Sequence, residues 1–407
     1  MKPNFIIAVT GQSNSQGNGG HYEISRTEDQ PHERVMGWNA RDNKWVIATL
    51  TDESLGTSDH RIPGSQSFAF HFAKQIAKND PTKVVGIVNY GIGGQPIKRW
   101  TKIPSQGLFR LVPNGWKKDT TVFSLKACND RILCLDPLKQ YHASRPVNIN
   151  YGWEAFSILD ANTKKPIPIH ELRQGKVLIK SAFHNTFVSI GSNGIVSPSS
   201  VETDECIVDT EIVNTGYTKM YAFKGKNGYL CLNSLVHVDG PMIGVDINAT
   251  SLVGISPEEE QTDTPHGDIY NVHVDRIKKA LYEANLRKID CICWHQGEAD
   301  FACFGTYYEN AICQTIEQYR SESFCNDDTM FIVGNTSKVP DSNVDWWRER
   351  NTQLSKLNVD YMLNTACVDT VGVDYNIIDK IHFSSEGHRQ LGNLYCEKYL
   401  KMKKLIL

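Results

Sequence analysis

The pattern of hydrophobic and polar positions divides the chain into two α/β zones with a β-rich zone between them. Residues 1–100 and 264–407 alternate short β-branched runs with stretches in which apolar residues recur at helical spacing. Residues 101–263 carry many short strand-like runs and almost no helical periodicity. Alternation of strands and helices is typical of a parallel sheet covered by helices on both faces. The active site of such a sheet lies at the carboxyl ends of its strands.

The first zone opens with the apolar run FIIAVT at residues 5–10, which predicts a buried strand. A turn rich in Gly, Ser and Asn follows it, and then a long loop. Apolar residues between Phe68 and Ile76 recur at helical spacing, and VVGIVN at residues 84–89 predicts a second strand, buried on both faces.

The last zone again alternates predicted helices and strands, with four helices and three strands. The expected strands lie at residues 289–294, at 330–335 and near 360–365. The expected helices cover residues 269–284, 306–320, 343–356 and 385–401.

The middle zone contains an internal repeat. Three segments share an apolar pair, a lysine, a polar turn and an apolar run: FSLKACNDRILCLD from Phe123, VLIKSAFHNTFVSI from Val177, and YAFKGKNGYLCLN from Tyr221. The repeat spacing of about 40–55 residues is in the range of repeated β units. Further strand candidates in the three units are WEAFSIL, ECIVDTEIV and INATSLVGI. Three such units of about four strands predict a β-trefoil, with chance similarity among β-strands as the alternative.

The different hydrophobic patterns of the three zones predict that an all-β domain is inserted into an α/β domain. We place the first part of the α/β domain at residues 1–106, the inserted all-β domain at 107–262, and the second part of the α/β domain at 263–407. A chain of 407 residues is too long for one simple core, which agrees with two domains.

Composition and charge narrow the classes of function. Hydrophobic residues make up 40% and charged residues 22% of the chain, as in an ordinary globular protein, and the formal net charge is -3. We therefore expect no nucleic-acid partner and no membrane partner. The apolar run at the start is too short for a signal peptide, and no run could span a bilayer. We expect synthesis in the cytoplasm; the final location stays unknown, and release or incorporation in a virus particle stays open.

The 11 cysteines are an odd number without metal-like spacing, so we expect them to be mostly reduced.

Two sequence blocks together suggest nucleophilic catalysis. Gly11-Gln12-Ser13-Asn14 follows the first strand, where a rigid sheet can present a hydroxyl at its rim. Asp379 and His382 lie three residues apart, a spacing that can set a carboxylate against one imidazole nitrogen and leave the other nitrogen for a serine. The first block could also be a polar turn, and the second a helix-capping turn with a surface histidine.

Two further blocks follow buried strands. The glycines of Asn89-Tyr-Gly-Ile-Gly-Gly94 allow backbone N–H groups to approach a ligand closely, but no dinucleotide-binding spacing opens a helix there. In Trp294-His-Gln-Gly-Glu298 a side-chain amide can donate to an oxyanion, or Gln296 and Glu298 can cap the next helix. His295 and Glu298 have no third ligand at useful spacing, so we expect no metal.

The four blocks together resemble the SGNH (GDSL-like) hydrolase superfamily. The sequence motifs are similar to those of its sialate O-acetylesterase and carbohydrate esterase family 6 branch. They are, in this order, GQSN, GGxxI..W, WHQGE and DxxHF, and the segment PGSQSFAFHFA is similar to that branch as well. The resemblance covers residues 1–100 and 264–407. It implies a three-layer α/β/α SGNH-hydrolase fold, flavodoxin-like, with a parallel sheet.

The resemblance also implies roles for individual residues. Ser13 would be the nucleophile, His382 the base and Asp379 its partner. The oxyanion hole would consist of the N–H groups of Ser13 and Gly94 and the Gln296 side chain. Glu298 would be a structural carboxylate or a rival orienter of His382. Ser15 differs from the branch, which often has Met directly after GQSN. We expect this difference to affect the shape of the substrate pocket and not the nucleophile. Candidate substrate or supporting contacts are Asn14, Asn89, Gln95, Trp100, His295 and Glu298, with Arg61 and Arg99 also flanking the blocks.

The implied activity is removal of O-acetyl groups from a carbohydrate, either a sialic acid or an acetylated polysaccharide, without metal or cofactor. The middle zone is similar to fascin-like and other β-trefoil domains, although the Gln-x-Trp signature of ricin-type lectins is missing; its ligand could be a glycan or a protein. One alternative is a glycan-binding or structural protein on an esterase scaffold, for instance in a virus particle. Another is an acyltransferase or thioesterase with the same triad.

Overall fold

The computed structural model divides the chain into two compact units. It describes residues 1–20, 23, 25–50, 67–104, 107–114, 120–128, 131–135, 140–145, 152–215, 218–232, 240–245, 266–300, 306–337, 344–358, 362–378 and 380–406. Unit 1 comprises Met1–Ile97, Asp268–Phe301 and Gln318–Leu407, and unit 2 comprises Lys98–Gly267 and Ala302–Glu317.

Unit 1 is built on a seven-stranded sheet with the order β19-β18-β17-β1-β4-β2-β3. All neighbouring strands are parallel except β2 and β3. The strands are β1 (Phe5–Gly11), β2 (Val35–Asn39), β3 (Lys44–Ile47), β4 (Val85–Gly91), β17 (Cys291–His295), β18 (Met330–Gly334) and β19 (Thr365–Val368).

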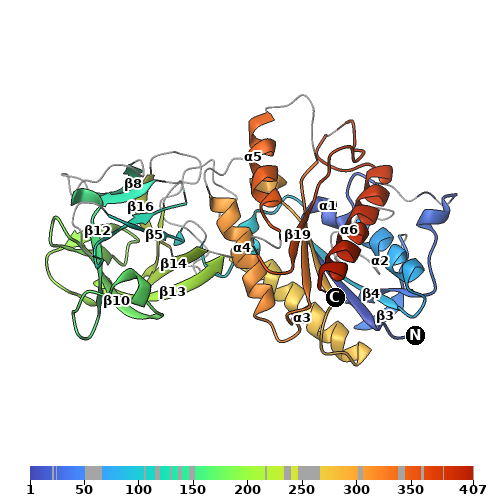
Figure 1. Cartoon of the computed structure of the whole chain (residues 1–407), viewed down its shortest axis with the longest axis horizontal. Coiled ribbons are helices and arrows are strands. Elements are labelled where there is room, and N and C mark those ends of the chain that lie inside the picture. The colour runs from blue at the N-terminus through green and yellow to red at the C-terminus, as the bar shows by residue number, and fades with distance from the viewer. Residues whose placement is uncertain are drawn as a thin grey trace. The chain divides into compact units, whose positions relative to one another are not determined.

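Helices cover both faces of this sheet, as the strand–helix alternation predicts. Figure 1 shows α2 (Phe68–Asn79) and α6 (Ser385–Ile406) on one side and α3 (Asp268–Ala284) on the other. Every second residue of β1, namely Phe5, Ile7 and Val9, joins the apolar core under α2 and α6. The remaining helices are α1 (Ser13–Gln16), α4 (Tyr307–Arg320) and α5 (Val344–Ser355). Unit 1 is therefore an α/β unit with a largely parallel sheet.

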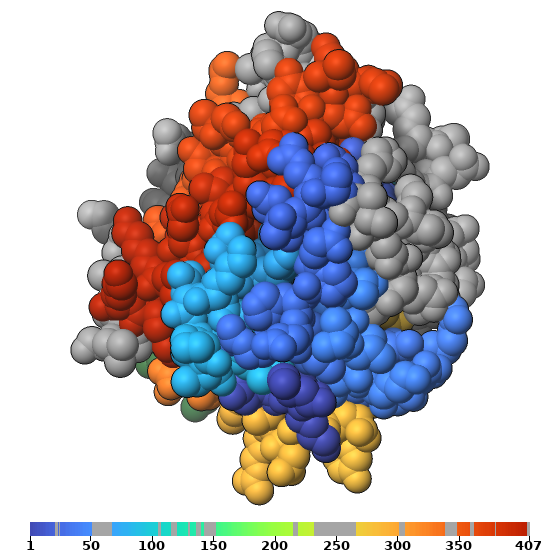
Figure 2. All heavy atoms as spheres, turned by 90° about the vertical axis from the view of Figure 1, so that its right-hand side faces the viewer, coloured from blue at the N-terminus to red at the C-terminus, as the bar shows by residue number. Residues whose placement is uncertain are grey.

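The two ends of the chain meet in unit 1. Figure 2 shows residues of the blue N-terminal part and of the red C-terminal part side by side on one face. Arg389 of α6 donates from Nε and Nη2 to both carboxylate oxygens of Asp29, at 2.9 and 2.8 Å, and the Asp29 residue has no exposed surface. Such bidentate pairs are among the stronger charge-assisted contacts. They tie the loop after α1 to the last helix.

Two local expectations were wrong. The segment expected as part of a long loop contains the hairpin of β2 and β3, in which Trp38 pairs with Trp45. Its strands are only five and four residues long and mix apolar with polar residues, so no clear period marks them. The strand expected near 360–365 is Thr365–Val368, shifted toward the carboxyl end.

The described residues of unit 2 form β-strands, short 3-10 helices and the first part of α4. Among its described residues, twelve strands form one sheet in which all pairings are antiparallel. The strands are β5 (Arg110–Pro113), β6 (Phe123–Lys126), β7 (Ile132–Leu135), β8 (Tyr141–Arg145), β9 (Phe156–Asp160), β10 (Gly175–Ser181), β11 (Phe187–Ile190), β12 (Val196–Ser199), β13 (Ile207–Thr215), β14 (Thr218–Gly225), β15 (Gly228–Leu232) and β16 (Gly240–Val245).

The three repeated segments form three hairpins. Each repeat lysine is paired across its hairpin: Lys126 with Ile132, Lys180 with Phe187, and Lys224 with Tyr229. Pairings also run from β5 through β6, β9, β10 and β13 to β14, and a bridge from Phe109 to Tyr221 returns to the start of β5. Six strands thus form a closed circuit. The strand candidate INATSLVGI lies outside the described residues.

The ten cysteines that the structure describes are all free thiols, and nine of them are buried. No described helix is both long and apolar enough to cross a membrane.

Candidate active site at the carboxyl ends of the strands

The register of the sheet brings three of the four sequence blocks to one edge. Gly11 at the end of β1 lies opposite His295 of β17 on one side and Gly91 of β4 on the other. Gly11 has a φ of 137°, and a Cβ there would lie 2.0 Å from the His295 carbonyl oxygen. Only glycine fits this position, because both the backbone angle and the close approach exclude a side chain.

Ser13 begins the short helix α1 directly after β1 and Gln12, and it is 5% exposed. The Ser15 hydroxyl donates to the Gln12 carbonyl at 2.6 Å and so closes this turn. A Cβ on Gly93 would lie 3.4 Å from Ser13 Cβ, which places the loop after β4 beside Ser13. Gly94 has a φ of 69°, and a Cβ built there would meet no described atom within 4 Å.

Asn14 connects the Ser13 turn to the segment around His382. Its Nδ2 donates to the Ile381 carbonyl at 3.2 Å, and its Oδ1 accepts from the Phe383 N–H at 3.1 Å. The neighbour of Ser13 therefore holds the residues on both sides of His382. Asn14 has no exposed surface, so it supports the site from below and does not line it.

Further contacts hold His382 in place. The residue is half-buried. Its carbonyl accepts from the Asn376 N–H at 2.8 Å, and the Ser337 hydroxyl donates to the Ile381 carbonyl at 2.8 Å. A Cβ on Gly19 would lie 2.4 Å from His382 Cβ, so the chain after α1 runs against the histidine. Asp379, the expected partner of His382, lies outside the described residues.

Glu298 is a buried carboxylate beside the same segment. It is 5% exposed, and its Oε1 accepts from Asn14 Nδ2 at 2.6 Å. Within the described part of the chain, its Oε2 has no hydrogen-bond partner. Burial raises the pKa of Glu298, the Asn14 hydrogen bond and the field of His382 lower it, and the net shift is upward.

Gln296 ties the loops after three strands together. Its Nε2 donates to Gln12 Oε1 at 3.3 Å and to the Gln95 carbonyl at 3.1 Å, and it also contacts Asp300 Oδ2. An amide nitrogen has only two protons, so these acceptors already engage it fully. In this arrangement Gln296 positions the loops, and a role as oxyanion donor would require it to exchange partners.

The other expected contacts are largely internal. His295 has no exposed surface, and burial lowers its pKa to about 3, which keeps the ring neutral at ordinary pH. Asn89 Nδ2 donates to the Ser15 carbonyl at 3.2 Å, and Gln95 Nε2 donates to the Gly93 carbonyl at 3.1 Å. Trp100 is completely buried and belongs to unit 2, as does Arg99, and Arg61 lies outside the described residues.

The sequence blocks did not reveal Ser337, Gly19 or His388. The His388 ring lies 3.0 Å from the Asn18 carbonyl through Nε2, and burial lowers its pKa to about 4. These residues act through contacts that are distant in sequence, so no local pattern marks them. Within the described ranges, no group of three or more His, Cys, Asp or Glu residues could hold a metal ion.

Comparison with known families identifies the family of the chain. The family model "Carbohydrate esterase, sialic acid-specific acetylesterase" matches residues 3–126 and 249–401. The chain belongs to this family of carbohydrate esterases. The residues between the two matched stretches include most of the strands of unit 2.

Solved structures show weaker likeness. A protein from Arabidopsis thaliana is 15% identical with a TM-score of 0.48, and 98% of each chain is covered. NanS is also 15% identical, with a TM-score of 0.46 and 99% of each chain covered. Because both TM-scores are below 0.5, the assignment rests on the family match. No curated protein matches the chain.

Proposed function

We propose that this protein is a serine O-acetylesterase of the SGNH type, which removes acetyl groups from a sialic acid or an acetylated polysaccharide. The observation that carries the proposal is the double hydrogen bond of Asn14 to the residues flanking His382. Ser13 is the next residue along the chain, so this clamp keeps a hydroxyl and an imidazole at the same edge of the sheet. Membership of the carbohydrate esterase family supports the substrate class.

In the proposed reaction, His382 takes the proton of Ser13 as the hydroxyl oxygen attacks the acetyl carbonyl. The N–H groups of Ser13 and Gly94 stabilise the oxyanion, with Gln296 as the third candidate donor. Loss of one such donor typically costs about 3 kcal/mol of transition-state stabilisation. The sugar alcohol leaves with the proton from His382, and water then hydrolyses the acetyl-enzyme. The chemistry needs no metal or organic cofactor.

Two carboxylates compete for the role of orienting His382. Asp379 is the candidate by motif, and the proposed triad is Ser13, His382 and Asp379. Glu298 is the rival, because its pKa responds to the field of His382 and its second oxygen has no partner within the described residues. An orienting carboxylate fixes the imidazole tautomer, and its loss lowers kcat by orders of magnitude while the fold persists.

For the inserted segment we propose a β-trefoil at residues 107–262, between α/β parts at 1–106 and 263–407. Support comes from the three lysine-bearing hairpins and from the closed circuit of six strands. Its ligand would be a glycan or a protein partner.

The test of the activity is release of 4-nitrophenol from 4-nitrophenyl acetate, together with release of acetate from O-acetylated sialic acid and acetylated xylan. We expect turnover by the wild type and none by Ser13→Ala or His382→Ala. Equal activity in wild type and Ser13→Ala would reject Ser13 as nucleophile. Absence of activity in all three proteins would favour a binding or structural role. Added acceptor alcohols would separate an acyltransferase, because the acetyl group would then appear on the acceptor.

Asp379→Asn and Glu298→Gln separate the two carboxylates. If Asp379 orients the base, Asp379→Asn lowers kcat strongly and Glu298→Gln lowers it mildly. The reverse order would assign the role to Glu298.

A further inference from the structure

The residues directly after α1 lie against three parts of the candidate active site. The Asn18 N–H donates to the Ser13 carbonyl at 3.0 Å and so closes the turn that carries the candidate nucleophile. A Cβ on Gly93 would lie 3.4 Å from Ser13 Cβ and 3.6 Å from Asn18 Nδ2, which places the Asn18 side chain beside the loop after β4. A Cβ on Gly19 would lie 2.4 Å from His382 Cβ. A shift of this segment would therefore disturb the nucleophile, the loop after β4 and the candidate base together.

The backbone around Asn18 does not hold this position by itself. Gly17 and Gly19, on its two sides, have φ angles of 93° and 87°, in the left-handed region that glycine adopts at least cost. Two such glycines give the segment many accessible conformations, so a single conformation depends on contacts from other elements. One such contact comes from His388 of α6, whose Nε2 lies 3.0 Å from the Asn18 carbonyl oxygen.

The His388 ring is a fixed donor in this contact. The residue has no exposed surface. Because a carbonyl oxygen only accepts, the ring carries a proton on Nε2. Burial lowers the pKa of His388 to about 4, so the ring is neutral at ordinary pH and has this one proton. The buried Nδ1 has no partner within the described ranges, which agrees with this tautomer because an N–H there would be an unpaired donor.

The same ring also contacts the segment of the candidate base. Phe383, the residue after His382, meets the His388 ring edge-on, with ring centroids 6.1 Å apart. The Phe383 N–H is also the group that Asn14 Oδ1 accepts from at 3.1 Å. His388 therefore lies between the chain that follows Ser13 and the chain that follows His382.

We propose that His388 is a positioning residue of the ester-hydrolysing site, which acts through Asn18 on Ser13 and through Phe383 on His382. Its hydrogen bond to the Asn18 carbonyl keeps the hydroxyl and the imidazole at their working distance. His388 touches neither the substrate nor the reacting atoms, because it is completely enclosed. This role in catalysis rests on the proposed function, whereas the effect of the hydrogen bond on the Asn18 segment can be measured without a substrate.

Three substitutions of His388 separate its hydrogen bond from its volume. His388→Phe keeps a ring and removes the donor. Glutamine can place its amide nitrogen near the position of Nε2, whereas asparagine ends near the position of Nδ1 and does not reach the Asn18 carbonyl. His388→Gln and His388→Asn are thus a pair with the same chemistry and different reach, and they carry the test even if His388→Phe does not fold.

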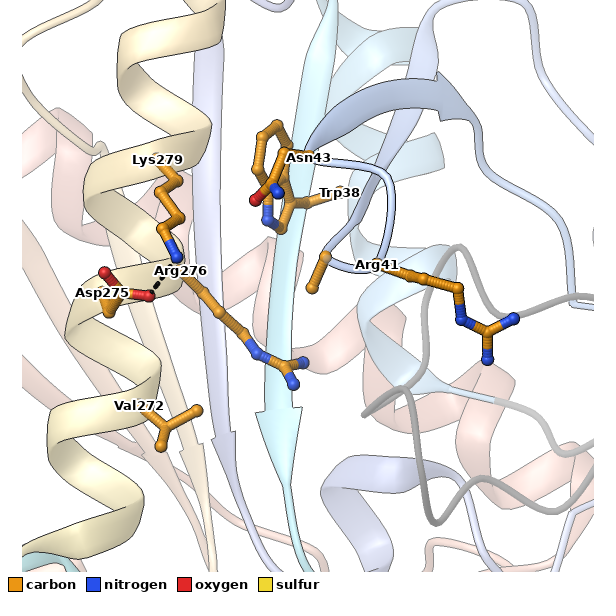
Figure 3. A pocket seen from close by; sticks show the side chains of 8 residues that line it. Trp38, Arg41, Asn43, Val272, Asp275, Arg276 and Lys279 are labelled. Atoms are coloured by element: carbon orange, nitrogen blue, oxygen red, sulfur yellow. Dashed lines mark ion pairs between the residues drawn. The ribbon is translucent and has the colours of Figure 1, made fainter.

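His273→Phe is the matched control. His273 is also completely buried, and its Nδ1 lies 2.8 Å from the Tyr319 hydroxyl oxygen. It belongs to α3, which lies on the other side of the sheet from α6 (Figure 1). Figure 3 shows part of this helix, where Asp275 and Lys279 form an ion pair and line a pocket of about 340 Å³ with the β2–β3 hairpin. None of the residues that line this pocket belongs to the four blocks, so His273→Phe should lower stability without moving the candidate site.

The first measurement is hydrogen–deuterium exchange of the full chain without substrate, followed by mass spectrometry of peptides that cover residues 13–20. We expect these amides to exchange about fivefold faster in His388→Phe and His388→Asn, the change that loss of one neutral hydrogen bond produces. His388→Gln and His273→Phe should exchange there as the wild type does. Peptides from β18 report any global loss of stability.

The second measurement is kcat and KM on 4-nitrophenyl acetate, below the unfolding range of every variant. A misplacement of about 1 Å near the reacting groups can cost about 100-fold in rate, so we expect kcat to fall about 10–100-fold in His388→Phe and His388→Asn. KM should stay within about twofold, because no substrate contact is removed. His388→Gln should recover kcat to within about threefold of the wild type, and His273→Phe should keep it.

The outcomes separate this role from the proposed function. Wild-type kcat and exchange in His388→Asn, equal losses in His388→Gln and His388→Asn, or a loss confined to the thermal midpoint would overturn the positioning role while hydrolysis by the wild type stands. Absence of hydrolysis in the wild type would reject the proposed function, and with it the catalytic role of His388.

Discussion

Replacement of Asn14 by alanine removes three hydrogen bonds at once, two of them buried and one partly buried. The side chain donates to Glu298 Oε1 at 2.6 Å and to the Ile381 carbonyl at 3.2 Å, and it accepts from the Phe383 N–H at 3.1 Å. A neutral hydrogen bond contributes about 1 kcal/mol and one to a charged group about 1.5–3 kcal/mol. Asn14→Ala should therefore lower the free energy of unfolding by about 4 kcal/mol.

The same substitution should lower activity, because the clamp on the His382 segment is lost. A misplacement of about 1 Å near a catalytic group can cost about 100-fold in rate. We expect a fall of that order in kcat on 4-nitrophenyl acetate, measured below the unfolding range. Ser15→Ala is the matched control: it lies in the same short helix and loses one hydrogen bond, to the Gln12 carbonyl, so it should cost about 1 kcal/mol with a small effect on kcat.

A double-mutant cycle with Glu298→Ala, which removes the acceptor that glutamine would keep, tests the reasoning further. Because Asn14 and Glu298 share a buried hydrogen bond, the two changes should couple by more than about 0.5 kcal/mol in unfolding free energy. An Asn14→Ala protein that keeps the wild-type kcat, or strict additivity of the two changes, would refute the clamp.

Three further predictions concern the contacts that hold unit 1 together. Arg389→Met leaves Asp29 buried without its main partner and should cost about 3–5 kcal/mol at pH 7 in urea unfolding. Burial raises the pKa of Asp29, but the hydrogen bonds of Arg389 and a backbone N–H lower it more; this stabilisation is therefore present at neutral pH and is lost as the pH falls through the lowered pKa, and an equal cost at pH 7 and in strong acid would contradict it. Lys74→Met removes the hydrogen bonds of one ammonium group to three backbone carbonyls and should cost about 2–4 kcal/mol, whereas the exposed control Lys78→Met should leave the urea midpoint nearly unchanged. Gly392→Ala should destabilise by about 1–3 kcal/mol despite the better helix propensity of alanine, because a methyl group would lie 2.5 Å from a Cβ of the adjoining helix α2; a gain in thermal midpoint would refute this.

The α/β part of the fold could be predicted because its signals are local. Strands such as β1 and β4 are buried on both faces and appear as continuous apolar runs, and α3 and α6 present long periodic faces. The β2–β3 hairpin was missed because its stability comes from Trp45 packing on α3, a contact between residues 235 positions apart. Such a tertiary contact leaves no period in a four-residue strand.

In the candidate site, too, features that depend on local sequence could be predicted, and those that depend on distant contacts could not. The positions of Ser13, Gly94 and Gln296 at strand ends follow from the order of strands and turns, and the register of the sheet agrees with it. The clamp of Asn14 on the His382 segment spans 367 and 369 residues, and no spacing rule reaches that far. The role of Asp379 stays a prediction from its motif.

The most direct test of the proposed hydrolase is covalent labelling by a fluorophosphonate, which reacts only with an activated serine hydroxyl. We predict that mass spectrometry of digested protein finds the label on Ser13, and that His382→Ala, folded as judged by circular dichroism, loses the label. Labelling that is absent from the folded wild-type protein, falls on another serine, or survives in His382→Ala at the wild-type rate would contradict the pairing of this hydroxyl with this imidazole.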